Sequence, residues 1–161
     1  MQDIIKVGMA DLKVAKAPQI LTTLGLGSCV GIALYDKANK VAGLAHIMLP
    51  DSTQIKNNAN KAKFADTAMQ VLIQELEKSG ANINRLTSKI AGGAQMFSID
   101  TQSDMMKIGA RNVQATKALL NSYKIPLLAE DTGGNFGRTI EIYPDTGALL
   151  VKAIGKGKTE L

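Results

Sequence analysis

The stretch from Leu21 to Pro50 constrains the fold of this chain most strongly, because it predicts a β-hairpin. Apolar residues alternate with smaller ones from Val30 to Tyr35, which is the period of a strand. Residues 36–40 are polar and typical of a turn, and residues 41–49 are apolar again. We therefore expect an antiparallel pair of strands in this stretch.

The same hairpin contains the only cysteine, Cys29, and the only histidine, His46. If Lys37 and Ala38 form its tip, Cys29 lies directly opposite His46. Directly opposed residues share a sheet face, with Cβ atoms about 4.5–5.5 Å apart, so the thiol and the imidazole can form a hydrogen bond. A slip of one residue in this register would place the two side chains on opposite faces.

Length and composition exclude several classes of protein. The chain of 161 residues fits one domain, residues 1–161, whose last residues, 155–161, we expect to be frayed. One cysteine excludes an internal disulfide and a multi-thiolate site, and one histidine adds little, so we expect no metal and no cofactor. The net charge of +5 comes from scattered basic residues with few aromatics, which argues against nucleic-acid binding.

The chain also lacks signals for export or membrane insertion. Its first residues, MQDIIKVGMADLKVAK, contain no long apolar run, and no stretch approaches the ~18 apolar residues of a membrane span. A free thiol in such a chain predicts a cytoplasmic protein. Without a coiled-coil pattern or a long exposed apolar face, we expect a monomer.

Two segments have the period of amphipathic helices. Residues 64–79 form the clearer one, and its expected apolar face consists of Ala65, Ala68, Met69, Leu72, Ile73 and Leu76. The second covers residues 109–123, with Ala110, Val113, Leu120 and Tyr123 expected to face inward. Many short strands joined mainly by hairpins predict an α+β fold, a layered sandwich of mostly antiparallel sheet with the two helices outside.

A cysteine beside a histidine predicts nucleophilic chemistry at a carbonyl carbon. The imidazole takes the thiol proton, and the thiolate attacks to give a thioester that water then hydrolyses. Gly25 and Gly27 allow an unusual backbone path and a close approach just before Cys29. Backbone N–H groups around Gly27, Ser28 and Cys29 are the local candidates for oxyanion donors.

These residues alone leave two questions open. A single cysteine and a single histidine in apolar strands are also typical of ordinary core positions. The histidine needs a partner to fix its orientation, and sequence spacing does not choose among the candidates, which are Thr22, Thr23, Ser28, Asp51, Glu130, Asp131 and Asn135. Phe97, after a Gly-Gly pair, fits either a core position or an exposed anchor for a protein partner.

Several motifs resemble one known family, in order along the chain. They are LGLGSCVGIALYD, AHIMLPDS, KFADTA, AGGAQMF, IGARN and LAEDTGGNFGR. Together they are similar to the CheD family, the chemoreceptor glutamine deamidases of bacterial and archaeal chemotaxis. The resemblance extends from about Val7 to about Val151.

The resemblance implies a function and a set of site residues. It implies that Cys29 is the nucleophile, His46 the base and Thr23 the residue that orients the histidine. The implied reaction is hydrolysis of receptor glutamine side chains to glutamate, with receptor methylesterase activity in some members. The implied partners are a chemoreceptor cytoplasmic domain and a CheC-type phosphatase, and the implied fold is related to the deamidating domains of certain toxins.

Three other functions remain to be compared with this one. The first is a binding module that regulates the phosphatase, in which case the thiol is incidental. The second is a cysteine peptidase or esterase with a small substrate, and the third is a structural domain with a buried thiol. Cys29→Ala separates the first from the deamidase, and mass spectrometry of the receptor separates the second.

Overall fold

The computed structural model describes residues 3–96 and 107–161. Its elements, in chain order, are β1 (Ile4–Lys6), β2 (Asp11–Lys16), β3 (Ile20–Leu26), β4 (Val30–Asp36), β5 (Val41–Ile47), η1 (Ser52–Gln54), η2 (Lys61–Lys63), α1 (Ala65–Lys78), η3 (Ile83–Arg85), β6 (Thr87–Gly92), α2 (Ile108–Ser122), β7 (Leu127–Thr132), β8 (Arg138–Ile142), β9 (Leu149–Ala153) and β10 (Gly157–Glu160).

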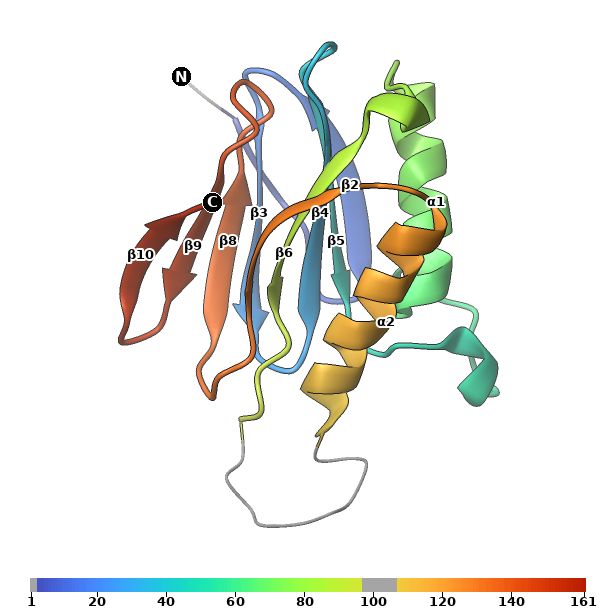
Figure 1. Ribbon diagram of the computed structural model, residues 1–161, viewed down its shortest axis with the longest axis vertical. Helices are drawn as coiled ribbons and strands as arrows, with labels where there is room; N and C mark the ends of the chain where they lie inside the picture. The colour runs from blue at the N-terminus through green and yellow to red at the C-terminus, as the bar shows by residue number, and fades with distance from the viewer. Residues whose placement is uncertain (1–2, 97–106) are drawn as a thin grey trace.

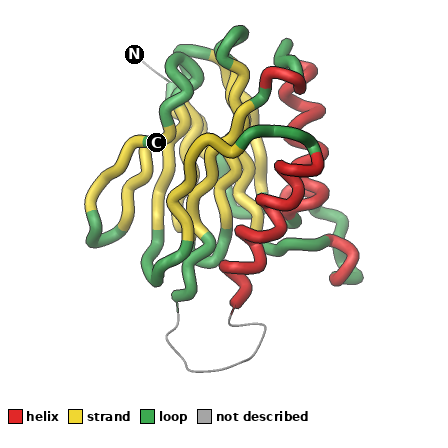
Figure 2. The backbone as a smooth tube through the Cα atoms, viewed as in Figure 1, coloured by secondary structure: helices red, strands yellow, loops and turns green. Residues whose placement is uncertain are grey.

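The strands form two five-stranded sheets, with the orders β1-β3-β8-β9-β10 and β2-β5-β4-β6-β7. Six of the eight strand pairings in the described ranges are antiparallel, and only β1–β3 and β6–β7 are parallel. Both helices lie on the outer face of the β2-β5-β4-β6-β7 sheet, and the other sheet covers its inner face (Figures 1 and 2). The α+β layered fold expected from the sequence is confirmed.

Two apolar cores hold the three layers together. One lies between the helices and their sheet and includes Ile32, Leu72 and Ile90. The other lies between the two sheets and includes Leu44, Ile140 and Cys29. The cysteine therefore lies at the sheet–sheet interface, where both sheets can contribute side chains to its surroundings.

The first helix matches its predicted face, and the second matches its predicted face at three of four positions. All six residues of the expected face of α1 are buried. In α2, Leu120 is buried and Val113 and Tyr123 pack partly buried against the core, whereas Ala110 is exposed. The other buried positions are Gly109, Asn112 and Thr116. The face of α2 that packs inward is therefore narrow and partly polar, which an apolar pattern does not reveal.

The β4–β5 hairpin forms as expected, but its register differs by two residues. His46 pairs with Gly31 rather than with Cys29, and Asp36 pairs with Val41. The physical cause is a longer turn, because the Asp36 carboxylate accepts hydrogen bonds from the N–H groups of Ala38 and Asn39 at 3.0 and 3.4 Å. A shift of two residues preserves the sheet faces.

The C-terminal tail is ordered by strand pairing. Residues 157–160, within the tail expected to be frayed, form β10 and pair antiparallel with β9. This pairing gives the tail backbone partners that its polar sequence did not predict. Among the described residues, neither helix is long and apolar enough to cross a membrane.

Candidate active site

The site lies where three strands of two different sheets meet. β3 contributes Thr23, β5 contributes His46, and the bend 27–29 before β4 contributes Cys29. Gly31, opposite His46, lets the two sheets pack closely, because a Cβ there would lie 2.5 Å from Cδ1 of Ile140. A larger side chain at this position would press the two sheets apart beside the histidine.

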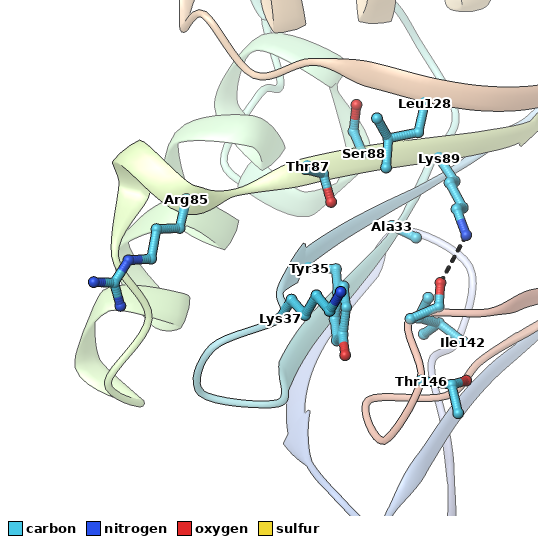
Figure 3. Close-up of a pocket in the computed structure, with 11 residues that line it drawn as sticks. Ala33, Tyr35, Lys37, Arg85, Thr87, Ser88, Lys89, Leu128, Ile142 and Thr146 are labelled. Atoms are coloured by element: carbon cyan, nitrogen blue, oxygen red, sulfur yellow. Dashed lines mark hydrogen bonds between the residues drawn. The ribbon is translucent and has the colours of Figure 1, made fainter.

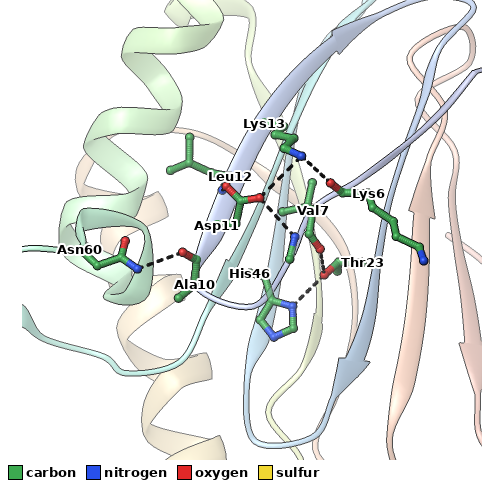
Figure 4. A network of polar contacts seen from close by, with 10 residues as sticks. Lys6, Val7, Ala10, Asp11, Leu12, Lys13, Thr23, His46 and Asn60 are labelled. Carbon is green, nitrogen blue, oxygen red and sulfur yellow. Dashed lines mark hydrogen bonds and ion pairs between the residues drawn. The ribbon is translucent and has the colours of Figure 1, made fainter.

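Thr23 and His46 form a hydrogen bond across the sheet–sheet interface, and both side chains are fully buried. Oγ1 of Thr23 lies 2.7 Å from Nδ1 of His46 and donates its own hydrogen to the carbonyl oxygen of Val7, also at 2.7 Å (Figure 4). A hydroxyl has one hydrogen, and the carbonyl can only accept. Nδ1 must therefore donate, so the neutral imidazole carries its proton on Nδ1 and a lone pair on Nε2.

Nε2 of His46 is buried and has no hydrogen-bond partner within the part of the chain that the structure describes. Cys29 precedes Gly31 by two residues, so it is a diagonal neighbour of His46. Diagonal neighbours on one sheet face are about 7–8 Å apart, with their Cβ atoms somewhat closer. Catalytic hydrogen bonds are often long until substrate is bound.

Burial acts on both titrating groups and favours their neutral forms. It raises the pKa of the Cys29 thiol above its ordinary value, and the backbone N–H of Cys29 itself acts in the opposite direction. Burial lowers the pKa of His46. The resting pair is therefore a thiol and a neutral imidazole, which is the state in which Nε2 can accept a proton.

Hydrogen bonds hold the carbonyl groups of the bend 27–29 against the scaffold. The N–H of Ala94 donates to the oxygen of Gly27, and the N–H of Gly93 donates to the oxygen of Cys29, both at 2.8 Å. Nδ2 of Asn112 donates to the oxygen of Ser28 at 3.0 Å and to that of Met48 at 2.9 Å. The loop that carries the cysteine is thus fixed at three successive residues.

The N–H groups of this bend differ in their availability. That of Gly27 donates to the oxygen of Gly25 at 3.1 Å. Those of Ser28 and Cys29 donate to no other residue in the described ranges of the chain, and that of Cys29 faces only its own thiol. Among the backbone donors named from the sequence, Ser28 and Cys29 are therefore better suited than Gly27 to stabilise an oxyanion.

Four of the six other residues considered as partners of His46 are engaged elsewhere. Thr22 donates to the oxygen of Ile140, and Asp51 caps η1. Glu130 pairs with Lys117, and Asp131 pairs with Arg138. Of the side chains compared in the sequence analysis, only Thr23 contacts the imidazole in the described structure.

Two residues near the site were not assigned a role from the sequence. Met96 lies beside Gly27, where a Cβ would lie 3.2 Å from its Cγ, and it is 46% exposed. Asn112 donates hydrogen bonds to the carbonyl groups of Ser28, just before Cys29, and of Met48, two residues after His46. The IGARN motif was the available signal for Asn112. The proposed partner anchor Phe97 lies outside the described residues.

A pocket elsewhere in the molecule does not belong to this site. It has a volume of about 210 Å³ and is lined by residues that include Tyr35, Lys89 and Ile142 (Figure 3). Nζ of Lys89 donates to the carbonyl oxygen of Gly147 at 2.8 Å. Tyr35 is six residues beyond Cys29 along extended chain, a separation of about 20 Å.

Comparisons with known proteins give a consistent result. Residues 48–153 match the family model for CheD, described as CheD chemotactic sensory transduction. The chain is 64% identical over 154 residues to a probable chemoreceptor glutamine deamidase CheD of Caldanaerobacter subterraneus subsp. tengcongensis, covering 96% of this chain and 95% of that protein. It is 53% identical over 162 residues to the chemoreceptor glutamine deamidase CheD of Halalkalibacterium halodurans, covering 100% of each chain.

Among solved structures, the crystal structure of the Bacillus licheniformis hypothetical protein YfiH aligns with a TM-score of 0.47 and 15% sequence identity. The alignment covers 76% of this chain and 50% of that chain. This likeness is too low to bear on function.

Proposed function

The chain belongs to the CheD family, and from this premise we propose that it hydrolyses glutamine side chains of chemoreceptors to glutamate. The single observation that best supports this proposal is the open Nε2 of His46. Its Nδ1 is bonded to Thr23, and its other nitrogen is buried without a partner in the described structure, on a residue that pairs with Gly31, two positions after Cys29. A purely structural histidine would be expected to have both ring nitrogens satisfied.

The first step of the proposed reaction is attack by Cys29. Nε2 of His46 takes the proton from Sγ, and the thiolate forms a bond to the side-chain carbonyl carbon of the substrate glutamine. The carbonyl π electrons move to the oxygen and give a tetrahedral oxyanion. The N–H groups of Ser28 and Cys29 are the proposed donors to this oxygen.

The second and third steps release the products. Collapse of the tetrahedral intermediate breaks the C–N bond, and the imidazolium gives its proton to the departing ammonia. The resulting thioester is attacked by water, whose proton passes to Nε2. A second tetrahedral intermediate then expels Cys29 and leaves glutamate on the receptor, with the enzyme restored.

Thr23 acts on this sequence through the histidine. Its hydroxyl is held by the Val7 carbonyl, so it can only accept from Nδ1–H and keeps the lone pair on Nε2. The imidazolium formed in the first step also retains this hydrogen bond. We therefore assign Thr23 the role of fixing the tautomer and the ring orientation, as in catalytic triads generally.

The proposed reaction changes the charge of the receptor. Conversion of glutamine to glutamate replaces a neutral amide by a carboxylate of nearly the same size. The change adds one negative charge at a defined position of the receptor without altering its packing volume, and local charge changes of this kind shift conformational equilibria. We place the reaction in the cytoplasm, at the receptor's cytoplasmic domain.

A second proposed role is binding to a CheC-type phosphatase, which the family resemblance implies. This role does not require the thiol, so it is compatible with deamidation in the same protein. The Cys29→Ala variant keeps the binding role and loses the enzymatic one. Measuring phosphatase binding and deamidation on that variant therefore separates the two functions.

Oxygen-isotope labelling tests the hydrolytic chemistry directly. A receptor cytoplasmic fragment is incubated with the protein in H₂¹⁸O, and its peptides are analysed by mass spectrometry. Deamidation through a thioester incorporates one ¹⁸O atom at each modified glutamine, whereas ester hydrolysis removes a methyl group and peptidase activity cuts the chain. Unmodified receptor after incubation with folded protein would contradict the proposed function.

A further inference from the structure

We propose that Asn112 is a positioning residue of the site, which aims the Cys29 N–H at the reacting oxygen by holding the Ser28 carbonyl. This inference rests on the proposed deamidase function and adds a residue to it. Asn112 lies on α2, far along the chain from the other site residues. Its side chain joins the segment before Cys29 to the segment after His46 through one amide group.

The first argument concerns burial. Asn112 is fully buried in the first half of α2, on the face that packs against the sheet. Its Nδ2 donates to the carbonyl oxygens of Ser28 and Met48, which fixes the assignment of its amide because those oxygens only accept. Ser28 directly precedes the cysteine, and Met48 follows the histidine by two residues. One side chain thus fixes the distance between the two reacting segments.

The second argument is geometric. In a trans peptide unit, the C=O and N–H groups point in opposite directions. The Ser28–Cys29 peptide is trans, so the Cys29 N–H points away from the Asn112 amide that binds the Ser28 oxygen. The Ala94 N–H holds the Gly27 oxygen and orients the Ser28 N–H in the same manner. Both N–H groups that donate to no other residue in the described structure thus belong to peptides whose carbonyl oxygens are held.

The third argument is energetic. Oδ1 of Asn112 is buried and has no hydrogen-bond partner in the described part of the chain. An unpaired buried polar atom costs about 1–3 kcal/mol, so an apolar residue of similar size would avoid that cost. The chain retains the amide at this position, where its two donors meet the loop carbonyls. Such an arrangement is expected when orientation matters more than stability.

The test compares Asn112→Ala with Thr116→Val, a matched control. Thr116 is also fully buried on α2, one turn further on, and its hydroxyl bonds only to the Asn112 carbonyl among the contacts described. Both variants remove a buried polar group from the same helix face, but only the first releases the Cys29 loop. Thermal unfolding shows that each variant is folded at the assay temperature.

Two readouts distinguish positioning from a structural role. We expect Asn112→Ala to lower kcat for receptor deamidation by about 10- to 100-fold with KM changed less than about threefold, because an oxyanion donor is lost from the transition state. We also expect the pH midpoint for alkylation of Cys29 by iodoacetamide to rise by about half a unit, because the Cys29 N–H then no longer faces its own sulfur. Thr116→Val should change neither quantity beyond about twofold in rate or 0.2 unit in midpoint.

The outcomes of these measurements test the positioning role of Asn112 separately from the proposed deamidase activity. If Asn112→Ala is folded and has the kcat and alkylation midpoint of Thr116→Val, the positioning role is wrong. If Asn112→Ala does not fold, Asn112→Ser replaces it, since a smaller hydroxyl retains only one donor, and the same two comparisons apply. If the wild-type protein has no turnover, the proposed function fails, and the alkylation midpoint alone still tests the role of Asn112.

Discussion

Thr23 and His46 are joined across two sheets by a 2.7 Å contact between Oγ1 and Nδ1. The contact links β3 of one sheet with β5 of the other, so the orientation of the imidazole depends on how the sheets pack. The Val7 carbonyl completes the chain by accepting the threonine proton. The acid–base group of the proposed reaction is thereby held by both halves of the sandwich.

Replacing Thr23 by valine tests this contact. Valine has nearly the same shape but leaves Nδ1–H and the Val7 carbonyl without a partner, so we expect the free energy of unfolding to fall by about 1–3 kcal/mol. Without the tautomer-fixing bond, kcat should fall by about 100-fold or more. Thr23→Ser retains the hydroxyl and should recover most of the activity. A Thr23→Val variant with wild-type kcat would show that Thr23 does not orient the histidine.

The buried histidine predicts how stability depends on pH. Burial lowers the pKa of His46, so the unfolded chain takes up a proton at a higher pH than the folded protein does. Stability from the neutral imidazole is fully present above the unfolded pKa of about 6.5 and falls as the pH drops below it, by at most about 1.4 kcal/mol per pH unit.

Urea unfolding between about pH 5 and pH 8 measures this dependence. His46→Gln removes the titrating group and should flatten the curve over that range. Equal slopes for the wild-type protein and His46→Gln would mean that the histidine titrates normally in the folded protein.

A glycine next to the nucleophile gives a prediction with an internal control. Gly92 has a φ of +112°, and a Cβ there would lie 2.2 Å from the Cys29 carbonyl oxygen. Gly80 has a φ of +97°, and a Cβ there would meet nothing within 4 Å. Both alanine variants incur backbone strain of about 1–2 kcal/mol, but only Gly92→Ala displaces the cysteine loop.

We therefore expect Gly92→Ala to lose nearly all deamidase activity and Gly80→Ala to retain it. Activity is measured on each variant at a temperature where circular dichroism shows it to be folded. Similar activities for the two folded variants would argue against a fixed Cys29 carbonyl as a requirement of the site.

The buried ion pair of Arg138 should contribute more to the free energy of unfolding than an exposed ion pair does. Its side chain is 1% exposed, donates from Nε and Nη2 to Oδ1 of Asp131 at 3.1 and 2.9 Å, and stacks on the Phe136 ring at 4.3 Å. Arg138→Met removes a partner of a largely buried pair and should lower the free energy of unfolding by about 2–4 kcal/mol.

Lys40→Met provides the comparison for Arg138→Met. Lys40 pairs with Asp145 at 2.9 Å, but both side chains are more than half exposed. Its loss should destabilise the protein far less than the loss of Arg138, because exposed ion pairs are screened by solvent. Chemical denaturation of both variants measures the difference, and equal losses would mean that the Arg138 contacts add little to stability.

The sequence predicts the layers of this fold better than its details. The apolar period of residues 64–79 predicts α1 and its buried face, because side chains three and four apart share one side of a helix. The hairpin register was wrong by two residues, because the Asp36 carboxylate stabilises a longer turn that composition alone does not specify. Because the shift was even, Cys29 and His46 nevertheless share a sheet face.

The site was only partly predictable for a similar reason. Cys29 and His46 stand out as single residues of their kinds within one hairpin. The contact between Thr23 and His46 depends on how two sheets pack, and the contacts of Asn112 depend on how α2 docks. Neither set of contacts produces a periodicity or a motif spacing that can be recognised in the sequence. The family resemblance indicated Thr23, whereas the role of Asn112 came from the contacts themselves.

The most direct test is peptide mass spectrometry of a receptor cytoplasmic fragment after incubation with the wild-type protein or with Cys29→Ala. We expect a gain of about one dalton at particular glutamines with the wild-type protein and none with the variant, because only the thiol can form the thioester. The same gain with both proteins would exclude Cys29 as the nucleophile. No gain with either folded protein on a matched receptor would contradict the deamidase function.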